Sequence, residues 1–134
     1  MPFFQKKIEN MLIEGRGYQF LIQGETFHCA LDVTMRFIGG KWKTVVLWYL
    51  RKETLRFGEL KKKIPDITEK MLSLQLKALE EDGLVRREVF PEVPLRVEYS
   101  LTDFGRSLLP VLEAIAQWGR DLAAERGELV EAKG

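Results

Sequence analysis

Apolar side chains recur every three or four residues along much of the chain, and this spacing predicts a mainly helical fold. Residues 4–12 carry the first apolar stripe, and Gly15 and Gly17 end it. Residues 31–38 carry the second stripe, which stops at Gly39-Gly40, a typical end signal for a helix. A third helix is predicted over residues 42–50. Its apolar face holds Trp42, Val45, Val46, Tyr49 and Leu50.

Two further helices are predicted between residues 57 and 83, joined by a tight connection. The first is short, and Pro65 ends it because proline cannot continue a helix. Thr68 is suited to cap the second helix, since its hydroxyl can accept a hydrogen bond from an amide group at the helix start. On a helical wheel one side of this second helix carries Leu72, Leu76 and Leu79. The opposite side carries Lys70, Ser73, Leu74 and Lys77.

After these helices the pattern changes from a helical period to an alternating one. Residues 95–101 alternate strictly between apolar and polar side chains, as a half-buried strand does. Residues 84–90 predict a weaker strand, and the Pro91–Pro94 link predicts a hairpin whose tip cannot continue the ladder. A short mixed stretch, residues 18–27, predicts one brief strand or turn. Helices followed by a hairpin and a last helix are the order of a winged helix-turn-helix.

One long final helix is predicted after Thr102, which caps it, with a kink at Pro110. Two adjoining apolar stripes run along this helix, one of them with the 4-3-4-3-4 spacing of a coiled coil. This surface would lie exposed in a monomer, so a second copy is favoured as its cover; the helix at residues 4–12 of the same chain is the alternative. The predicted dimer contacts are Phe4, Ile8, Met11, Leu112, Ile115, Trp118 and Leu122.

Composition limits the classes of protein that fit. The chain has 134 residues, of which 46% are hydrophobic, enough for one domain with a buried core. No apolar run approaches the ~18 residues of a membrane span, and charges interrupt the N-terminal apolar pattern, so we expect a cytoplasmic protein without a secretory signal. One cysteine excludes an intrachain disulfide framework, and one cysteine with one histidine cannot supply an ordinary metal centre. We expect the protein to use no cofactor and to have no enzymatic activity, because no nucleophile–base pair or phosphate loop is present.

The charge is uneven although its total is only +1. Residues 36–77 hold eleven basic and four acidic side chains, a net charge of +7, whereas the segments on either side are net negative. Such a block is typical of a polyanion-binding face, and a solvated lysine-rich surface is the alternative. Its position favours DNA, since a helix that exposes cations and a hydroxyl precedes a hairpin. The predicted DNA-binding residues are Lys61, Lys62, Lys63, Thr68, Glu69, Lys70, Ser73, Leu74, Lys77 and Arg96.

Several motifs, over about residues 29–120, follow one another in the order and spacing of a known family. They are Ile38–Trp42, Leu55–Leu60, Ile67–Leu72, Leu76–Val85, Val97–Thr102, Leu108–Leu112 and Trp118-Gly119. In these motifs the chain resembles the HxlR-type winged helix-turn-helix transcriptional regulators of prokaryotes. The resemblance implies a homodimer that binds DNA and whose N- and C-terminal helices form the dimer contact. The chain departs from the family at Ala30, where a proline usually follows the cysteine, and at Leu74, where a polar residue is usual.

Cys29 is the candidate for redox chemistry. The resemblance implies that some relatives sense oxidants or electrophiles through a cysteine at this place. The predicted helix start and the adjacent His28 favour a thiolate at Cys29, whereas Asp32, one turn further on, opposes it. A partly buried structural thiol is the alternative, which the lack of a second cysteine favours. An intersubunit disulfide in a dimer also stays open.

These patterns together predict a mainly α fold with a small β-hairpin wing. We expect a helical extension over residues 1–28, a winged helix-turn-helix domain with dimerisation helix over residues 29–126, and a flexible tail over residues 127–134. The predicted function is a sequence-specific regulator of transcription that binds double-stranded DNA as a homodimer, with the recognition helix in the major groove and the wing on the flanking backbone. The alternative is a winged-helix protein-interaction module that binds no DNA, which the acidic wing residue Glu92 and the exposed Leu74 keep open.

Overall fold

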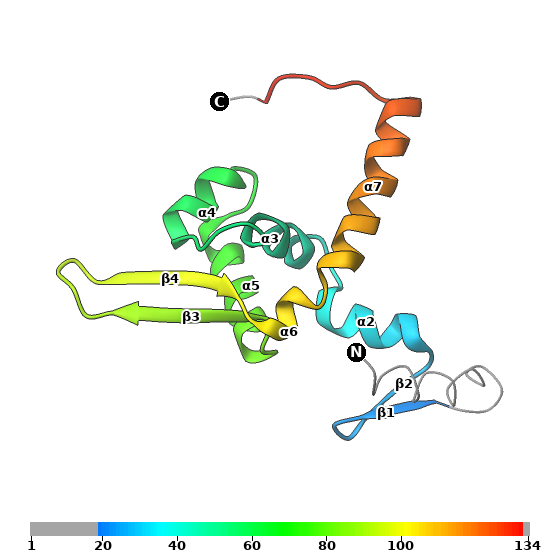
Figure 1. The fold of residues 1–134 in the computed structure, drawn as a ribbon, viewed down its shortest axis with the longest axis horizontal. Helices are drawn as coiled ribbons and strands as arrows, with labels where there is room; N and C mark the ends of the chain where they lie inside the picture. The colour runs from blue at the N-terminus through cyan, green and yellow to red at the C-terminus, as the bar shows by residue number, and fades with distance from the viewer. Residues whose placement is uncertain (1–18, 133–134) are drawn as a thin grey trace. The chain divides into compact units, whose positions relative to one another are not determined.

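The chain divides into two compact units, residues 1–40 and residues 41–134, in a computed structural model (Figure 1). The structure describes residues 19–132. The first predicted stripe, with the proposed dimer contacts Phe4, Ile8 and Met11, lies outside the described residues.

The described part of the first unit begins with a small hairpin. Strands β1 (Phe20–Ile22) and β2 (Glu25–Phe27) pair antiparallel. Gln23 and Gly24 form the two-residue turn, and both have positive φ, as the turn type that suits a tight hairpin requires. The prediction of a single strand or turn was therefore wrong, because a glutamine in this conformation gives little local signal for a hairpin.

Helix α2 (Ala30–Ile38) confirms the second predicted stripe and its end at the glycines. The backbone N–H of Gly39 donates to the carbonyl of Met35 at 2.8 Å and closes the last turn. Ile38 is buried, whereas Leu31 and Met35 of the same stripe are exposed.

The second unit confirms the predicted winged helix-turn-helix of helices and one hairpin. Its elements are α3 (Trp42–Leu50), α4 (Phe57–Lys63), α5 (Glu69–Glu81), β3 (Val85–Phe90), β4 (Arg96–Leu101), α6 (Asp103–Arg106) and α7 (Leu109–Arg126). The core lies where α3 and α5 pack on each other and on the base of the hairpin. Within it Leu72, Leu76 and Leu79 are buried, as the wheel of α5 predicts.

Helix α3 turns a different face to the core from the one that its sequence suggested. Val46, Leu47 and Leu50 are buried, whereas Trp42 and Tyr49 are only partly covered. The helix is apolar almost all round, so its periodicity does not select one face. The packing of α3 against α5 and β4 makes the choice.

The wing begins at a sharp turn after α5. Gly83 has a φ of +76°, and its N–H and that of Leu84 donate to the carbonyls of Glu80 and Leu79, which is a Schellman end. Strands β3 and β4 then pair in register from Val85 opposite Leu101 to the tip. Because these backbone contacts follow directly on α5, they set the direction in which the wing leaves the helix.

A short segment before α4 adds a third backbone partner to the wing. Leu55 and Tyr99 exchange two backbone hydrogen bonds, at 3.0 and 2.8 Å. The bridge brings the start of α4 next to β4, a contact that local patterns do not reveal.

The single long final helix was a wrong prediction, because the chain forms two helices there. Thr102 caps the short α6, with its hydroxyl accepting a hydrogen bond from the N–H of Gly105 at 3.0 Å. Gly105 lies so close to the wing base that a Cβ would meet the carbonyl oxygen of Leu84 at 2.1 Å. Pro110 falls in the first turn of α7, where its missing N–H costs no hydrogen bond. Instead of a kink at Pro110, the helix is interrupted between Arg106 and Leu109.

Candidate nucleic-acid interface

The connection between α4 and α5 holds the second helix at a defined angle. Ile64 and Ile67 are both buried, while Pro65 and Asp66 between them face solvent. The hydroxyl of Thr68 accepts a hydrogen bond from the N–H of Met71 at 3.0 Å, as the predicted cap requires. Two apolar anchors and one cap therefore fix where α5 begins.

Helix α5 separates its residues by face. Its three core leucines are at most 2% exposed. The six predicted site residues on this helix and its cap are all exposed. They are Thr68, Glu69, Lys70, Ser73, Leu74 and Lys77. The structure thus presents two cations, one carboxylate, two hydroxyls and an apolar side chain on the exposed surface and cap of the second helix of a helix-turn-helix.

The three consecutive lysines at the end of α4 differ from one another in their surroundings. The Lys61 ammonium donates to the carbonyl oxygen of Pro65 at 3.1 Å and so supports the turn. Lys63 forms an ion pair with Glu53 at 3.5 Å, while Lys62 is exposed. Cations in the last turn also suit the negative end of a helix dipole, so these lysines have a structural role besides any contact with phosphate.

A hollow of about 320 Å³ lies between α5 and the wing. Ser73 and Lys77 line it from the helix, and Arg87 and Tyr99, which face each other across the two strands, line it from the wing. Glu80 adds one carboxylate. The hollow joins two cations and two hydroxyl groups, donors that suit a phosphate. Sequence reasoning missed Arg87 and Tyr99, because their position beside α5 depends on the register of the hairpin.

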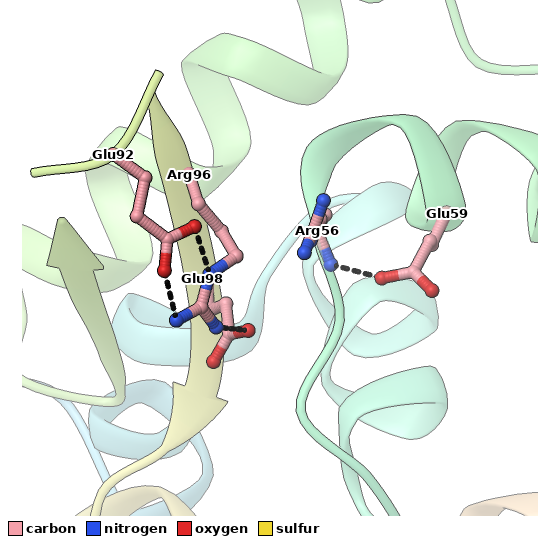
Figure 2. A network of polar contacts seen from close by, with 5 residues as sticks. All are labelled: Arg56, Glu59, Glu92, Arg96 and Glu98. Carbon is pink, nitrogen blue, oxygen red and sulfur yellow. Dashed lines mark hydrogen bonds and ion pairs between the residues drawn. The ribbon is translucent and has the colours of Figure 1, made fainter. Parts of the chain in front are cut away.

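The predicted site residue Arg96 is engaged within the wing itself (Figure 2). Its Nε and Nη2 atoms donate to the two carboxylate oxygens of Glu92 at 3.1 and 3.0 Å. Its Nη1 atom donates to the carboxylate of Glu98. The guanidinium lies 3.7 Å from the ring centroid of Phe90, its neighbour across the hairpin. Arg96 is therefore held on one face by a ring and along its edges by two carboxylates.

Charges around this arginine shift its ionisation and that of Glu92 in opposite directions. The hydrogen bond from Arg96 is the main cause that holds the pKa of the Glu92 carboxyl below its ordinary value; burial opposes it, and the charges of Arg96 and Arg56 add smaller lowering effects. Hydrogen bonds to Glu92 and Glu98 raise the pKa of Arg96. Figure 2 also shows Arg56, whose backbone N–H donates to the Glu59 carboxylate at 2.8 Å in the first turn of α4.

In the first unit Cys29 is the N-cap residue of α2 and is partly buried. The carbonyl oxygen of Cys29 accepts a hydrogen bond from the N–H of Val33 at 3.2 Å. The Asp32 carboxylate accepts one from the backbone N–H of His28 at 3.0 Å, which places a negative charge at the same helix start. Within residues 19–132 no group of three or more His, Cys, Asp or Glu side chains is arranged to hold a metal ion.

The outer surface of α7 carries exposed apolar side chains. Ile115 is 48% and Trp118 69% exposed. Leu112, in contrast, is buried and offers a partner little surface, so its predicted dimer contact stays a prediction. It lines a groove of about 290 Å³ between α3 and α7, together with Trp48 and Tyr49. Within the part of the chain that the structure describes, neither α7 nor any other helix is long and apolar enough to cross a membrane.

Comparison with known proteins identifies the family. The family model of the HxlR-like helix-turn-helix matches residues 37–126. An HTH-type transcriptional regulator of Methanothermobacter thermautotrophicus is 48% identical over 96 residues, which cover 72% of this chain and 73% of that protein. The HTH-type transcriptional regulator YdeP of Bacillus subtilis is 50% identical over 91 residues, or 68% of this chain and 71% of YdeP.

Solved structures agree with this match. The redox regulator HypR in its oxidised form superposes with a TM-score of 0.67 at 45% identity, over 69% of this chain and 96% of HypR. Reduced YodB of B. subtilis superposes with a TM-score of 0.62 at 34% identity, over 73% of this chain and 95% of YodB. Sequence and fold therefore lead to one conclusion: the chain belongs to the HxlR-like helix-turn-helix family and is a transcriptional regulator of the winged-helix type.

Proposed function

We propose that the protein binds double-stranded DNA as a homodimer, with α5 in the major groove and the wing along the flanking backbone. One observation carries the proposal: the second helix of the helix-turn-helix buries three leucines and turns Lys70, Ser73, Leu74 and Lys77 outward. In helix-turn-helix proteins this second helix contacts base edges through its N-terminal residues. Proteins named as HTH-type transcriptional regulators, at about half sequence identity, support the same assignment.

Different residues of this face suit different parts of a duplex. The Ser73 hydroxyl can bond to base edges, and Leu74 offers an apolar contact for a thymine methyl group. Glu69, in the first turn, can accept a hydrogen bond from a cytosine amino group. Lys77 and Arg87 converge on the hollow between helix and wing, where a backbone phosphate would satisfy both cations. In this proposal α5 recognises bases, and the residues around the hollow between α5 and the wing bind the DNA backbone.

Dimerisation is proposed through α7. Ile115 and Trp118 are exposed apolar side chains one turn apart on the same helix. Burying them against a second copy removes apolar surface from water and places two recognition helices in one particle. Two half-sites about 34 Å apart can then be occupied together.

The direct test measures binding of the purified full-length protein to duplex DNA from upstream of its own gene. Fluorescence anisotropy across a salt series should give a log–log line of negative slope, and a scrambled duplex should bind more weakly. Lys77→Ala should weaken both duplexes and flatten the slope by about 1. Arg126→Ala, which removes the same charge at the far end of α7, serves as the matched control. A wild-type protein that binds neither duplex would favour the protein-interaction module instead.

A thiol switch at Cys29 is a second candidate function, favoured by two structural relatives. HypR is described as a redox regulator, with oxidised and reduced forms, and YodB in reduced and diamide-treated forms. In this chain Cys29 caps α2, which ends at the glycines before α3. An oxidant such as diamide would join the Cys29 thiols of two subunits by taking up their two electrons and two protons, with a disulfide as product.

Diamide treatment tests this second candidate. Wild type should form a dimer on non-reducing electrophoresis and change its DNA affinity, and a reducing agent should reverse both effects. Cys29→Ser should show neither response. If oxidation leaves the DNA affinity of wild type unchanged, Cys29 is a structural residue.

A further inference from the structure

Two carboxylates of the wing hold Arg96 in the manner of a bound phosphate. Of the five N–H donors of its guanidinium, three are used by Glu92 and Glu98. The contact with Glu92 is bidentate, the geometry in which arginine also binds a phosphate group. A phosphate and the Glu92 carboxylate are therefore competing ligands for the same edge of the guanidinium. We call Glu92, Arg96 and Glu98 the wing clamp.

The surroundings of the wing clamp keep Arg96 turned towards its own chain. The Arg96 side chain is 24% exposed and that of Glu98 26%, whereas the Glu92 side chain, at 53%, lies on the solvent side. The Phe90 ring covers one face of the guanidinium. The charge of Arg56 also lowers the pKa of Glu92, and Figure 2 draws Arg56 together with Glu59, whose carboxylate accepts a hydrogen bond from the Arg56 backbone N–H. The wing tip thus offers a DNA backbone almost no net positive charge.

The wing clamp contributes little to holding the hairpin together. Strands β3 and β4 already pair over six residue pairs, and Tyr99 is tied to Leu55 by two backbone bonds. An ion pair to a carboxylate as exposed as that of Glu92 stabilises a fold only slightly. Glu92 can therefore be replaced without loss of the fold, and its effect on Arg96 can be measured separately.

We propose that Glu92 and Glu98 act as an intramolecular substitute for DNA phosphate and withhold Arg96 from the backbone. The inference rests on the DNA binding proposed above. It makes the two carboxylates determinants of overall affinity: they weaken binding to every sequence alike and leave the affinity ratio between specific and scrambled duplexes, which the base contacts of α5 set, unchanged. Arg96, which its sequence position suggests as a DNA contact, is in this arrangement a cation that the wing has already neutralised.

The test is the isosteric variant Glu92→Gln, alone and combined with Arg96→Gln. Glu92→Gln removes the charge that competes with phosphate, so specific and scrambled duplexes should both bind more tightly, by about fivefold at 0.15 M salt. The log–log salt slope should steepen by about 0.9, the value for one new phosphate contact. In the Arg96→Gln background the same change at Glu92 should have almost no effect, because the cation that it releases is absent. Glu128→Gln, an exposed position beyond α7, is the matched charge control.

The outcomes separate this inference from the proposed function. If wild type binds DNA but Glu92→Gln gains neither affinity nor slope, the wing clamp does not withhold Arg96. If Glu92→Gln gains equally with and without Arg96, the carboxylate acts by simple repulsion of DNA, and the inference is also overturned. A wild-type protein that binds no duplex overturns the proposed function and the inference with it. Circular dichroism melting curves of each variant show whether it is folded.

Discussion

Helices α5 and α7 both carry apolar residues at helical spacing, but these residues are buried on α5 and largely exposed on α7. On α5 the apolar residues at helical spacing lie in the core, and Leu72 and Leu79 are completely buried. On α7 Leu112 is buried, while Ile115 and Trp118 stay exposed. The difference teaches that an amphipathic pattern gives the apolar face of a helix but not what covers that face. The outer side of α5 offers Lys70, Ser73 and Lys77 to a polyanion, although three glutamates of the same helix are also exposed. The outer side of α7 exposes the apolar Ile115 and Trp118, which suit a protein partner.

The largest effect is expected from changing the outer side of α7. Ile115→Asp combined with Trp118→Glu places two charges in the proposed apolar contact, so the protein should become monomeric. Loss of the second recognition helix should lower affinity for the specific duplex by about 10²- to 10⁴-fold. Sedimentation velocity and anisotropy measure the two effects, with Val130→Asp, an exposed apolar position beyond α7, as control. A wild-type protein that sediments as a monomer at micromolar concentration would contradict the proposed dimer.

The next effect compares the two sides of α5. Leu72→Ala leaves a cavity in the core and should lower the free energy of unfolding by about 2–5 kcal/mol. Leu74→Ala, on the outer side, should change it by less than about 0.5 kcal/mol. Leu74→Ala should instead change the order of binding affinities among duplexes that differ at single base pairs. Urea denaturation measures the first pair of values. An unchanged ranking for Leu74→Ala would mean that this leucine does not contact bases.

A smaller effect is expected at the border of α5. Replacing Lys61, Lys62 and Lys63 by alanine should weaken all duplexes to a similar degree and flatten the log–log salt slope by about 1 for each lysine that contacts phosphate. Because Lys61 and Lys63 have partners within the chain, we expect the change in slope to be smaller than the value for three phosphate contacts. Anisotropy across a salt series gives the value. Unchanged affinity and slope would show that this face does not bind DNA.

The smallest effect is the pH dependence of the wing clamp. Arg96, and to a lesser extent Arg56, lower the pKa of Glu92 in the folded protein from its ordinary value of 4.5. Folding therefore gains stability from this group above pH 4.5, and the gain is lost as the pH falls through the lower folded value. The difference in melting temperature between wild type and Glu92→Gln should shrink as the pH is lowered from 6 towards 3. A difference that stays constant over this range would show that Glu92 is not stabilised by its arginine neighbours.

The elements of the second unit could largely be predicted, because the signals that determine them are local. Pro65 ends α4, Thr68 caps α5 and Gly83 ends it, each through contacts within about four residues. The alternation in residues 95–101 gave the second wing strand because its period differs from that of a helix. The exposed side of α5 follows from the same periodicity, so most of the candidate DNA-binding residues could be named from the order of residues.

Other features depended on residues far apart in the chain, and the tertiary structure decided them. Gly105 of α6 lies against the carbonyl oxygen of Leu84, and the backbone bridge of Leu55 to Tyr99 joins segments 44 residues apart. No spacing along the chain announces either contact. The same holds for Arg87, which reaches the hollow beside α5 only through the pairing of β3 with β4.

The sequence by itself determined where helices and strands lie, since hydrogen bonds and caps within one element depend on neighbouring residues. It also determined the concentration of basic residues over 36–77. The tertiary structure alone decided how those charges are used: the Lys63 ammonium, for example, forms an ion pair with the Glu53 carboxylate at 3.5 Å. A count of charges treats each side chain as available, whereas electrostatic energy depends on the distance between charges and on which carboxylate is already in contact. That distance is a property of the fold.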